Sequence, residues 1–268
     1  MININYIEFV MKLQENLEEF SLPPDNGKQQ QIRKRIADDL AIAVIELVLN
    51  LRPKLVLEIG AHEARFSREI KQKLPDSRVV AFEANPGVYG KYKKIIEPAG
   101  VEYLFQCIAD ENRLYDFSVP IKEGEGERVT MGSIHTDNVT KAYSTYQVKG
   151  RRLDDFLNNN IEANAMWVDV EGAIGSVLAG AKYTLRKTVL LFAELEATAR
   201  WNGQMLDVDV IAELANYKLY PVLRDIHRHK WQCNIVFLHE DVLRSPAVLE
   251  ICNRFINKTV NHVRNESN

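Results

Sequence analysis

The chain has 268 residues, of which 46% are hydrophobic and 26% are charged, and its formal net charge is -3. This composition fits one large soluble α/β domain, or such a domain with an extension. The small negative charge gives no indication of a general nucleic-acid-binding protein. No stretch reaches the ~18 uncharged apolar residues of a membrane span. Three scattered cysteines without a paired motif predict free thiols and a cytoplasmic protein.

Two helices are predicted before the first strand. Apolar residues recur at helical spacing over residues 2–20, a Pro-Pro-Asp-Asn-Gly break follows at 23–27, and a second helix is expected at about 29–50. We predict residues 1–52 as a helical extension that acts as a lid or as a homodimer contact. The alternative is that the second helix simply covers a sheet. Residues 53–268 are predicted as the main domain.

The main domain opens with an apolar run at residues 54–59, a sharp turn at Gly60-Ala61 and a helix at 64–73. Strand, small-residue turn and helix form the first unit of a nucleotide-binding sheet. Gly60 permits the turn and a close approach of the ligand. A dinucleotide-binding loop needs three glycines, and this loop has one. The loop therefore favours S-adenosylmethionine over a pyrophosphate ligand, and a plain α/β scaffold is the alternative.

The second strand, at 77–83, ends in Glu83, about 25 residues beyond Glu58. An acid at this point accepts hydrogen bonds from both ribose hydroxyls of a bound nucleoside, and a surface acid is the alternative. A third strand at 101–108 precedes Ala109 and Asp110. We predict these two residues as the wall of the adenine site, with a loop-capping aspartate as the alternative.

The remaining elements alternate strands with helices. Strands are expected at 113–119, 145–149, 165–170, 188–196, 219–223 and 234–238, and helices at 86–97, 153–157, 172–183, 208–217 and the C-terminal end. This alternation predicts an α/β fold with a mostly parallel sheet and helices on both faces. A hairpin joins the last two strands, so the final strand is predicted to be antiparallel.

Four stretches carry a resemblance to a known family. They read Leu-Glu-Ile-Gly-Ala-His-Glu-Ala-Arg-Phe-Ser (57–67), Ala-Phe-Glu-Ala-Asn-Pro (81–86), Arg-Leu-Asp-Asp-Phe-Leu (152–157) and Trp-Val-Asp-Val-Glu-Gly-Ala (167–173). Their order and spacing, from about 54 to 240, resemble the FkbM family of S-adenosylmethionine-dependent methyltransferases. The resemblance implies a seven-stranded Rossmann-like sheet and O-methylation of a sugar, glycan or natural-product hydroxyl.

The resemblance also implies the cofactor site. The family turn usually reads Gly-Ala-Asn-x-Gly, and in this chain His62 and Ala64 replace the asparagine and the second glycine. The residues predicted to bind S-adenosylmethionine are Glu58, Gly60, Ala61, His62, Glu83, Ala84, Ala109, Asp110 and Asp169.

Asp169 and Glu171 alternate with two valines at the end of a buried strand, so both point to one side at its carboxyl edge. Methyl transfer to a hydroxyl needs a base, and we predict Asp169 first, with Glu171 and His135 as further catalytic residues. A surface histidine is the alternative for His135. Glu194 and Glu196 end the next strand on a shared face. The four acids could instead hold a divalent cation such as Mg²⁺, and some of them could merely cap helices or bind loops.

The acceptor is predicted to be a small molecule or a sugar, contacted by Glu194, Glu196, Trp201 and His227. A core tryptophan and a solvated hairpin histidine are the alternatives for the last two. Two other functions remain open. A nicotinamide-dependent oxidoreductase would share Gly60 and Glu83, and a catalytically silent nucleoside-binding module would keep the same fold.

Overall fold

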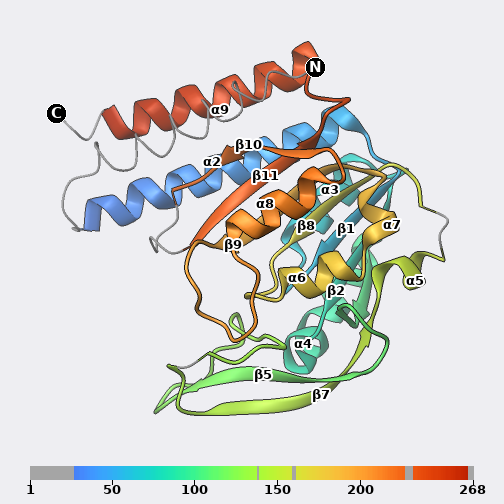
Figure 1. Cartoon of the computed structure of the whole chain (residues 1–268), viewed down its shortest axis with the longest axis vertical. Helices are drawn as coiled ribbons and strands as arrows, with labels where there is room; N and C mark the ends of the chain where they lie inside the picture. Colours follow the sequence, from blue (N-terminus) through green and yellow to red (C-terminus); the bar gives the residue numbers. More distant parts are fainter. Residues whose placement is uncertain (1–26, 138, 159–160, 227–231, 265–268) are drawn as a thin grey trace.

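The structure is a computed structural model that describes residues 27–137, 139–158, 161–226 and 232–264. The helix expected at residues 2–20 lies outside this range. Figure 1 shows a large sheet between layers of helices and a second, smaller sheet at one end of it. Among the described residues, no helix combines the length and the hydropathy of a membrane span. The three cysteines are free, as predicted.

The large sheet has seven strands in the order β10-β11-β9-β8-β1-β2-β3. Their bounds are β1 (Leu55–Ile59), β2 (Arg78–Glu83), β3 (Glu102–Phe105), β8 (Asn164–Val168), β9 (Thr188–Glu196), β10 (Leu219–Arg224) and β11 (Gln232–His239). The pairs β1–β2, β2–β3, β1–β8 and β8–β9 are parallel, whereas β11 is antiparallel to both of its neighbours. The predicted α/β fold, mostly parallel with an antiparallel last strand, is confirmed.

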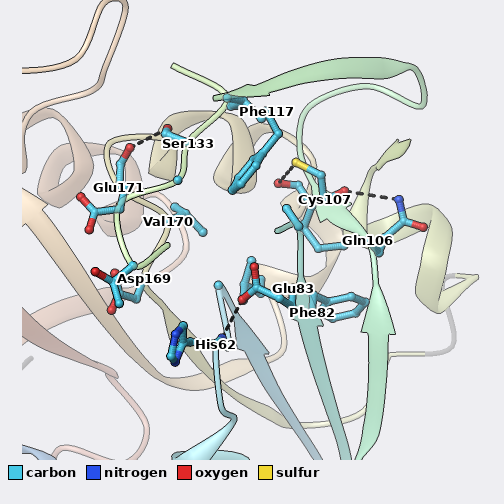
Figure 2. Close-up of a pocket in the computed structure, with 18 of the residues that line it drawn as sticks. His62, Phe82, Glu83, Gln106, Cys107, Phe117, Ser133, Asp169, Val170 and Glu171 are labelled. Carbon is cyan, nitrogen blue, oxygen red and sulfur yellow. Dashed lines mark hydrogen bonds between the residues drawn. The ribbon is translucent and has the colours of Figure 1, made fainter. Parts of the chain in front are cut away.

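The topology places a ligand site beside β1. From β1 the chain passes to β2 and β3 on one side and then crosses to β8 on the other, and ligands bind at such a reversal of strand order. Ile59 pairs with both Phe82 and Val168, so the three strands end level with one another. The residues at or just after these ends, Glu83 and Asp169 among them, therefore face one space (Figure 2).

Helices cover both faces of this sheet and bury two apolar clusters against it. The first face carries α2 (Gly27–Leu51), α3 (Arg65–Lys73), α4 (Pro86–Ile96) and α9 (Pro246–Arg264), and the second carries α5 (Leu153–Leu157), α6 (Ile174–Ala179), α7 (Lys182–Leu185) and α8 (Asp207–Ala215). A short 3-10 helix, η1 (Glu97–Ala99), follows α4. Both faces of the strands are apolar because both are covered.

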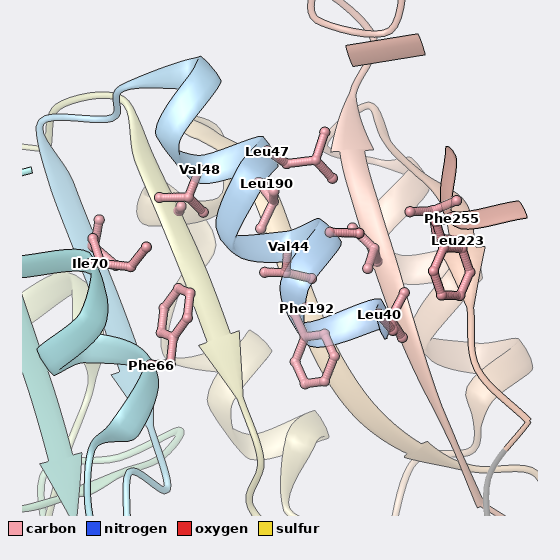
Figure 3. Packing of buried hydrophobic residues seen from close by; sticks show 14 of the residues in the cluster. Leu40, Val44, Leu47, Val48, Phe66, Ile70, Leu190, Phe192, Leu223 and Phe255 are labelled. Carbon is pink, nitrogen blue, oxygen red and sulfur yellow. The ribbon is translucent and has the colours of Figure 1, made fainter. Parts of the chain in front are cut away.

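The long helix α2 belongs to the core of the domain. Its buried stripe includes Leu40, Val44 and Leu47, which pack toward Leu190 and Phe192 of β9 (Figure 3). Helix α9 lies beside α2 (Figure 1). For residues 27–51 the structure therefore shows the alternative expected above, a helix that covers the sheet. The lid or dimer contact predicted for residues 1–52 stays a prediction, and residues 1–26 lie outside the described part of the chain.

A second sheet of four strands lies over the carboxyl ends of the strands of the large sheet. Its order is β4-β7-β5-β6, with β4 (Cys107–Ile108), β5 (Leu114–Lys122), β6 (Gly126–Glu127) and β7 (Tyr143–Arg151). Strands near β5 and β7 were expected, but their pairing in a separate sheet was not. The cluster around Tyr115, Phe117 and Val148 gives this sheet its own small apolar core. Phe117 also reaches the ligand cavity below it.

Candidate active site

A cavity of about 290 Å³ lies where β1, β2 and β8 end. Figure 2 shows Glu83 on one side of it and Asp169 and Glu171 on the other. Phe117 of β5 and the segment 129–134 close it from above. The polar side chains therefore converge from three strand ends beneath a lid of largely apolar and small residues.

Gly60 brings the turn after β1 into contact with the turn after β8. Its φ is 80°, and a Cβ there would lie 1.7 Å from the carbonyl oxygen of Asp169. The backbone N–H groups of Gly60 and Ala61 both donate to the carbonyl of Phe82, at 3.0 and 2.9 Å. Gly60 is thus required for the packing of the β1 turn on the β8 turn as well as for the bend.

His62 and Ala64 have left-handed backbones, with φ of 46° and 47°. Asparagine and glycine tolerate this conformation best, which explains why the Gly-Ala-Asn-x-Gly pattern has them at these positions. In this chain the strained turn is held by two hydrogen bonds. The N–H of His62 donates to Glu83 Oε2 at 2.7 Å, and the hydroxyl of Tyr103 donates to the His62 carbonyl at 2.6 Å.

Glu83 has the geometry expected of a ribose-binding acid. Its carboxylate lines the cavity and accepts the N–H of His62 at Oε2 and the N–H of Asn85 at Oε1, each at 2.7 Å. A carboxylate oxygen accepts more than one hydrogen bond, so both oxygens can still receive a ligand hydroxyl. Burial raises the pKa of Glu83 to about 7, although the hydrogen bonds from the N–H groups of Asn85 and His62 oppose this shift.

Glu58 does not line the cavity, in contrast to its predicted role in binding the cofactor. Its carboxylate accepts the N–H of Ser67 at 2.8 Å, in the first turn of α3. It satisfies one of the free N–H groups at the start of that helix. Burial raises the pKa of Glu58 to about 7.

The cavity wall predicted at Ala109 and Asp110 is formed instead by residues that come just before them in the chain. The cavity is lined by Gln106, Cys107 and Ile108 rather than by Ala109 and Asp110. The carbonyl of Ala109 lies 2.1 Å from the position of a Cβ on Gly180, so Ala109 packs against the end of α6. Asp110 accepts a hydrogen bond from the hydroxyl of Tyr115 at 2.8 Å. The alternative expected for Asp110, a loop-capping role, fits this placement.

The acids of β8 and β9 gather as predicted. Val168 pairs with Ala193, so the next residues on the two strands, Asp169 and Glu194, are neighbours. Carboxylate oxygens of Asp169, Glu171 and Glu194 all lie within 4.8 Å of one another. Burial raises the pKa of Asp169 to about 6 and that of Glu171 to about 8, and it raises the pKa of Glu194 well above its ordinary value.

The turn that carries Glu171 is anchored to the lid segment. Glu171 has a φ of 47°, and its carbonyl accepts a hydrogen bond from Ser133 Oγ at 2.7 Å (Figure 2). A Cβ on Gly132 would lie 2.5 Å from the ring of Phe117, so a larger residue there would displace this ring from the cavity wall. Sequence reasoning missed these residues, because segment 130–144 has few periodic cues and Gly132 was its one signal.

Three further predicted residues lie away from the cavity or outside the described chain. His135 is half-buried and lines a separate hollow, and burial lowers its pKa. Trp201 is 2% exposed, and its ring lies 2.3 Å from the position of a Cβ on Gly172. This burial corrects the predicted sugar-stacking role, because the ring has no free face. His227 lies outside the described residues.

Comparisons with known proteins agree with this geometry. Residues 58–219 match the family described as "Methyltransferase FkbM domain". The chain is also similar to the 2-O-methyltransferase NoeI of Sinorhizobium fredii (strain NBRC 101917 / NGR234), at 27% identity over 209 residues, which cover 73% of this chain and 82% of NoeI.

Two solved structures are more distant. Methyltransferase FkbM from Methylobacillus flagellatus KT has 15% identity and a TM-score of 0.40, with 69% of this chain covered and 43% of that protein. Magnesium protoporphyrin IX methyltransferase (ChlM) from Synechocystis PCC 6803, solved with bound SAM, has 10% identity and a TM-score of 0.42, with coverage of 86% and 97%. The fold is defined by the strand order itself.

The matched residues make up more than half of the chain and contain the turns after β1, β2 and β8, which line the cavity. The chain belongs to the FkbM family of S-adenosylmethionine-dependent methyltransferases.

Proposed function

We propose that this methyltransferase transfers the methyl group of S-adenosylmethionine to a hydroxyl of a sugar, a glycan or a natural product. The observation that carries the proposal is one cavity with Glu83 on one side and Asp169 on the other, at the reversal of strand order. A hydroxyl acceptor is supported by the similarity to NoeI, a 2-O-methyltransferase.

The cofactor would bind with its ribose hydroxyls on Glu83 and its adenine ring against Gln106 and Ile108. His62 lies beside the turn at the start of α3, where a methionine carboxylate would receive donors. The sulfonium would then lie toward Asp169 and Glu171. Their carboxylates favour the positively charged donor over S-adenosylhomocysteine, its neutral product.

Methyl transfer is a displacement in line with the sulfur. A C–O bond forms as the C–S bond breaks, the sulfonium becomes a neutral thioether, and the hydroxyl proton passes to a base. A hydrogen bond with Glu194 opposes the burial that raises the pKa of Asp169, whereas the charge of Asp169 adds to the burial that raises the pKa of Glu171, so Asp169 ionises before Glu171. Asp169 is therefore the better base of the two.

Calorimetric titration with S-adenosylmethionine, S-adenosylhomocysteine and NAD(H) tests the cofactor. We expect micromolar binding of the first two, and a loss of about tenfold or more in Glu83→Ala, because two charge-assisted hydrogen bonds disappear. Binding of NAD(H) alone would favour the oxidoreductase. Binding of none of the three would favour a silent module of the same fold.

The base is tested by Asp169→Asn. We expect turnover on a panel of hydroxylated sugars to fall by about 10²–10⁴-fold, with little change in the affinity for S-adenosylhomocysteine. Normal turnover in this variant would refute the assignment of Asp169 as the base.

A further inference from the structure

A second cavity lies beside the one described above. It has a volume of about 890 Å³, within the range of ligand pockets, and we call it the side cavity. Residues 120–123, 128, 131, 137, 139–142 and 198–200 line it. Arg128 and Met131 belong to this lining, whereas residues 129–130 and 132–133 line the first cavity. One short segment of chain therefore separates the two cavities.

The side cavity adjoins the end of the first cavity at which the methyl group of the cofactor is expected. Arg200 lines the side cavity, and its positive charge opposes the burial that raises the pKa of Glu171. Glu171 in turn lines the first cavity, where Figure 2 shows it beside Ser133 and across from Glu83. A ligand in the side cavity would therefore lie on the side of Glu171 and away from the ribose-binding end.

Two cations of the side cavity are available to a ligand. Arg128 and Lys141 are both exposed, and neither has a carboxylate partner among the residues that the structure describes. The guanidinium of Arg128 lies 3.7 Å from the sulfur of Met131. Lys122, by contrast, forms an ion pair with Glu125. Arg128 and Lys141 can therefore turn toward an anion in the cavity without giving up an ion pair.

Fewer acids than cations line the side cavity. Asp137 is buried, and its carboxylate accepts the N–H of Val139 and the hydroxyl of Thr140, each at 2.9 Å. Arg200 lies 3.9 Å from the same carboxylate. Glu123, in the turn between β5 and β6, is the second acid. Of the described residues that line the cavity, four are basic and two are acidic, so an anionic ligand is favoured over a cationic one.

Apolar side chains supply much of the remaining lining. Ile121 is 39% exposed and Val139 is 84% exposed, and Met131 lies on the segment between the two cavities. Ligand pockets commonly combine such a lining with a few charged groups that fix the orientation of the ligand. In the side cavity the apolar groups would pack against the face of a sugar ring, and the cations would hold a charged substituent.

We propose that the side cavity binds the acceptor through an anionic group, a phosphate or a carboxylate, that pairs with Arg128 and Lys141. Arginine and lysine both bind these two anions. The assignment of this cavity to the acceptor rests on the proposed function, and it specifies the acceptor further as a sugar that carries a negative charge. The reacting hydroxyl would extend past Met131 toward Asp169, which lines the first cavity.

The test is calorimetric titration of the full chain, saturated with S-adenosylhomocysteine, with glucose, glucose 1-phosphate and glucuronate. These probes share one ring, and the two anions distinguish a phosphate from a carboxylate. We expect one of the anions to bind about tenfold or more tightly than glucose, and this preference should shrink as the NaCl concentration rises from about 50 mM to about 500 mM.

Arg128→Gln and Lys141→Gln should each weaken binding of the preferred anion by about fivefold and leave glucose unchanged. Both positions are exposed, and thermal unfolding checks that the variants are folded. The matched control is Lys149→Gln on β7, which is also exposed but lines neither cavity, and it should bind as the wild type does.

Equal affinity for the three probes, binding of none of them, or equal affinities in Lys141→Gln and Lys149→Gln would overturn the proposal. Titration with S-adenosylhomocysteine alone separates the two proposals. Its binding without a preference for an anionic sugar refutes the anionic acceptor alone. A preference for an anionic sugar that depends on Lys141, in a protein that does not bind S-adenosylhomocysteine, refutes the proposed function alone.

Discussion

Ala64 occupies a backbone conformation that suits glycine. Its φ is 47°, which costs an alanine about 1–2 kcal/mol, whereas Ala61 in the same turn has no positive φ. We expect Ala64→Gly to raise the free energy of unfolding by about 1 kcal/mol, measured by urea denaturation. Ala61→Gly is the matched control and should lower it. If both variants destabilise the protein equally, the left-handed backbone conformation of Ala64 does not lower the stability of the wild type.

The raised pKa of Glu83 leads us to expect that nucleoside binding depends on pH. Burial raises the pKa of this carboxyl to about 7, and ribose hydroxyls would donate to the ionised form. Ligand binding therefore favours deprotonation, and the affinity should rise by about tenfold between about pH 6 and pH 8. S-adenosylhomocysteine is the ligand to titrate, because its neutral sulfur does not report on Asp169 or Glu171. Glu83→Gln should bind more weakly and lose the pH dependence, and an unchanged slope in this variant would assign it to another group.

At the scale of elements, Asp39 joins the two long helices of the first face. It accepts hydrogen bonds from His262 at 2.8 Å and Lys258 at 3.0 Å, both on α9. Burial alone would raise its pKa, but these partners lower it below the ordinary value of 3.8. The stabilisation is therefore present above about pH 4 and is lost as the pH falls further.

We expect Asp39→Asn to lower the free energy of unfolding at pH 7 by about 1 kcal/mol, because the ion pair of Asp39 with Lys258 is lost and its hydrogen bond with His262 is weakened. The difference from the wild type should shrink as the pH falls below about 4. Glu250→Gln removes an ion pair within α9 alone and should change stability less. Urea denaturation over a pH series measures both variants. A constant difference at every pH would show that Asp39 contributes by packing rather than by charge.

The elements of the large sheet could be predicted because each has a local signal. Apolar runs mark β1, β2, β8 and β9, and the acids that follow them end up at one edge because the strands are parallel. The second sheet could not be predicted in the same way. Its strands pair over long separations, such as Leu114 with Lys149, and no local pattern encodes that pairing. The end of β3 at Phe105 belongs to the same pairing, because the next residues, Cys107 and Ile108, pair with Gly150 and Arg151 of β7.

At the scale of the molecule, most of the acids with raised pKa values lie at the carboxyl edge of the large sheet. Glu58, Glu83 and Glu196 have values of about 7 and Glu171 about 8, all raised chiefly by burial above the ordinary 4.5. The folded state therefore holds protons that the unfolded chain releases, and stability falls as the pH rises through these values. Burial lowers the pKa values of His62 and His135, an opposing effect that diminishes as the pH rises above 6.5, the ordinary value for histidine, and ends about one pH unit higher.

Between about pH 6.5 and pH 8 the acids dominate, so we expect the thermal midpoint of the ligand-free protein to fall. One extra proton held by the folded state over this interval corresponds to about 2 kcal/mol, or about 5 °C. S-adenosylmethionine, with its positive sulfonium, should restore more stability at pH 8 than S-adenosylhomocysteine does at equal free concentration, because the charges of Asp169 and Glu171 favour its binding. Glu58→Gln keeps an acceptor for Ser67 but cannot ionise, so its midpoint should fall less steeply. Differential scanning calorimetry at constant ionic strength measures all of these midpoints. A wild-type midpoint that stays level or rises over the interval would mean that the buried acids are already ionised at pH 6.5, and with that the electrostatic argument for a cationic ligand at this edge would fail.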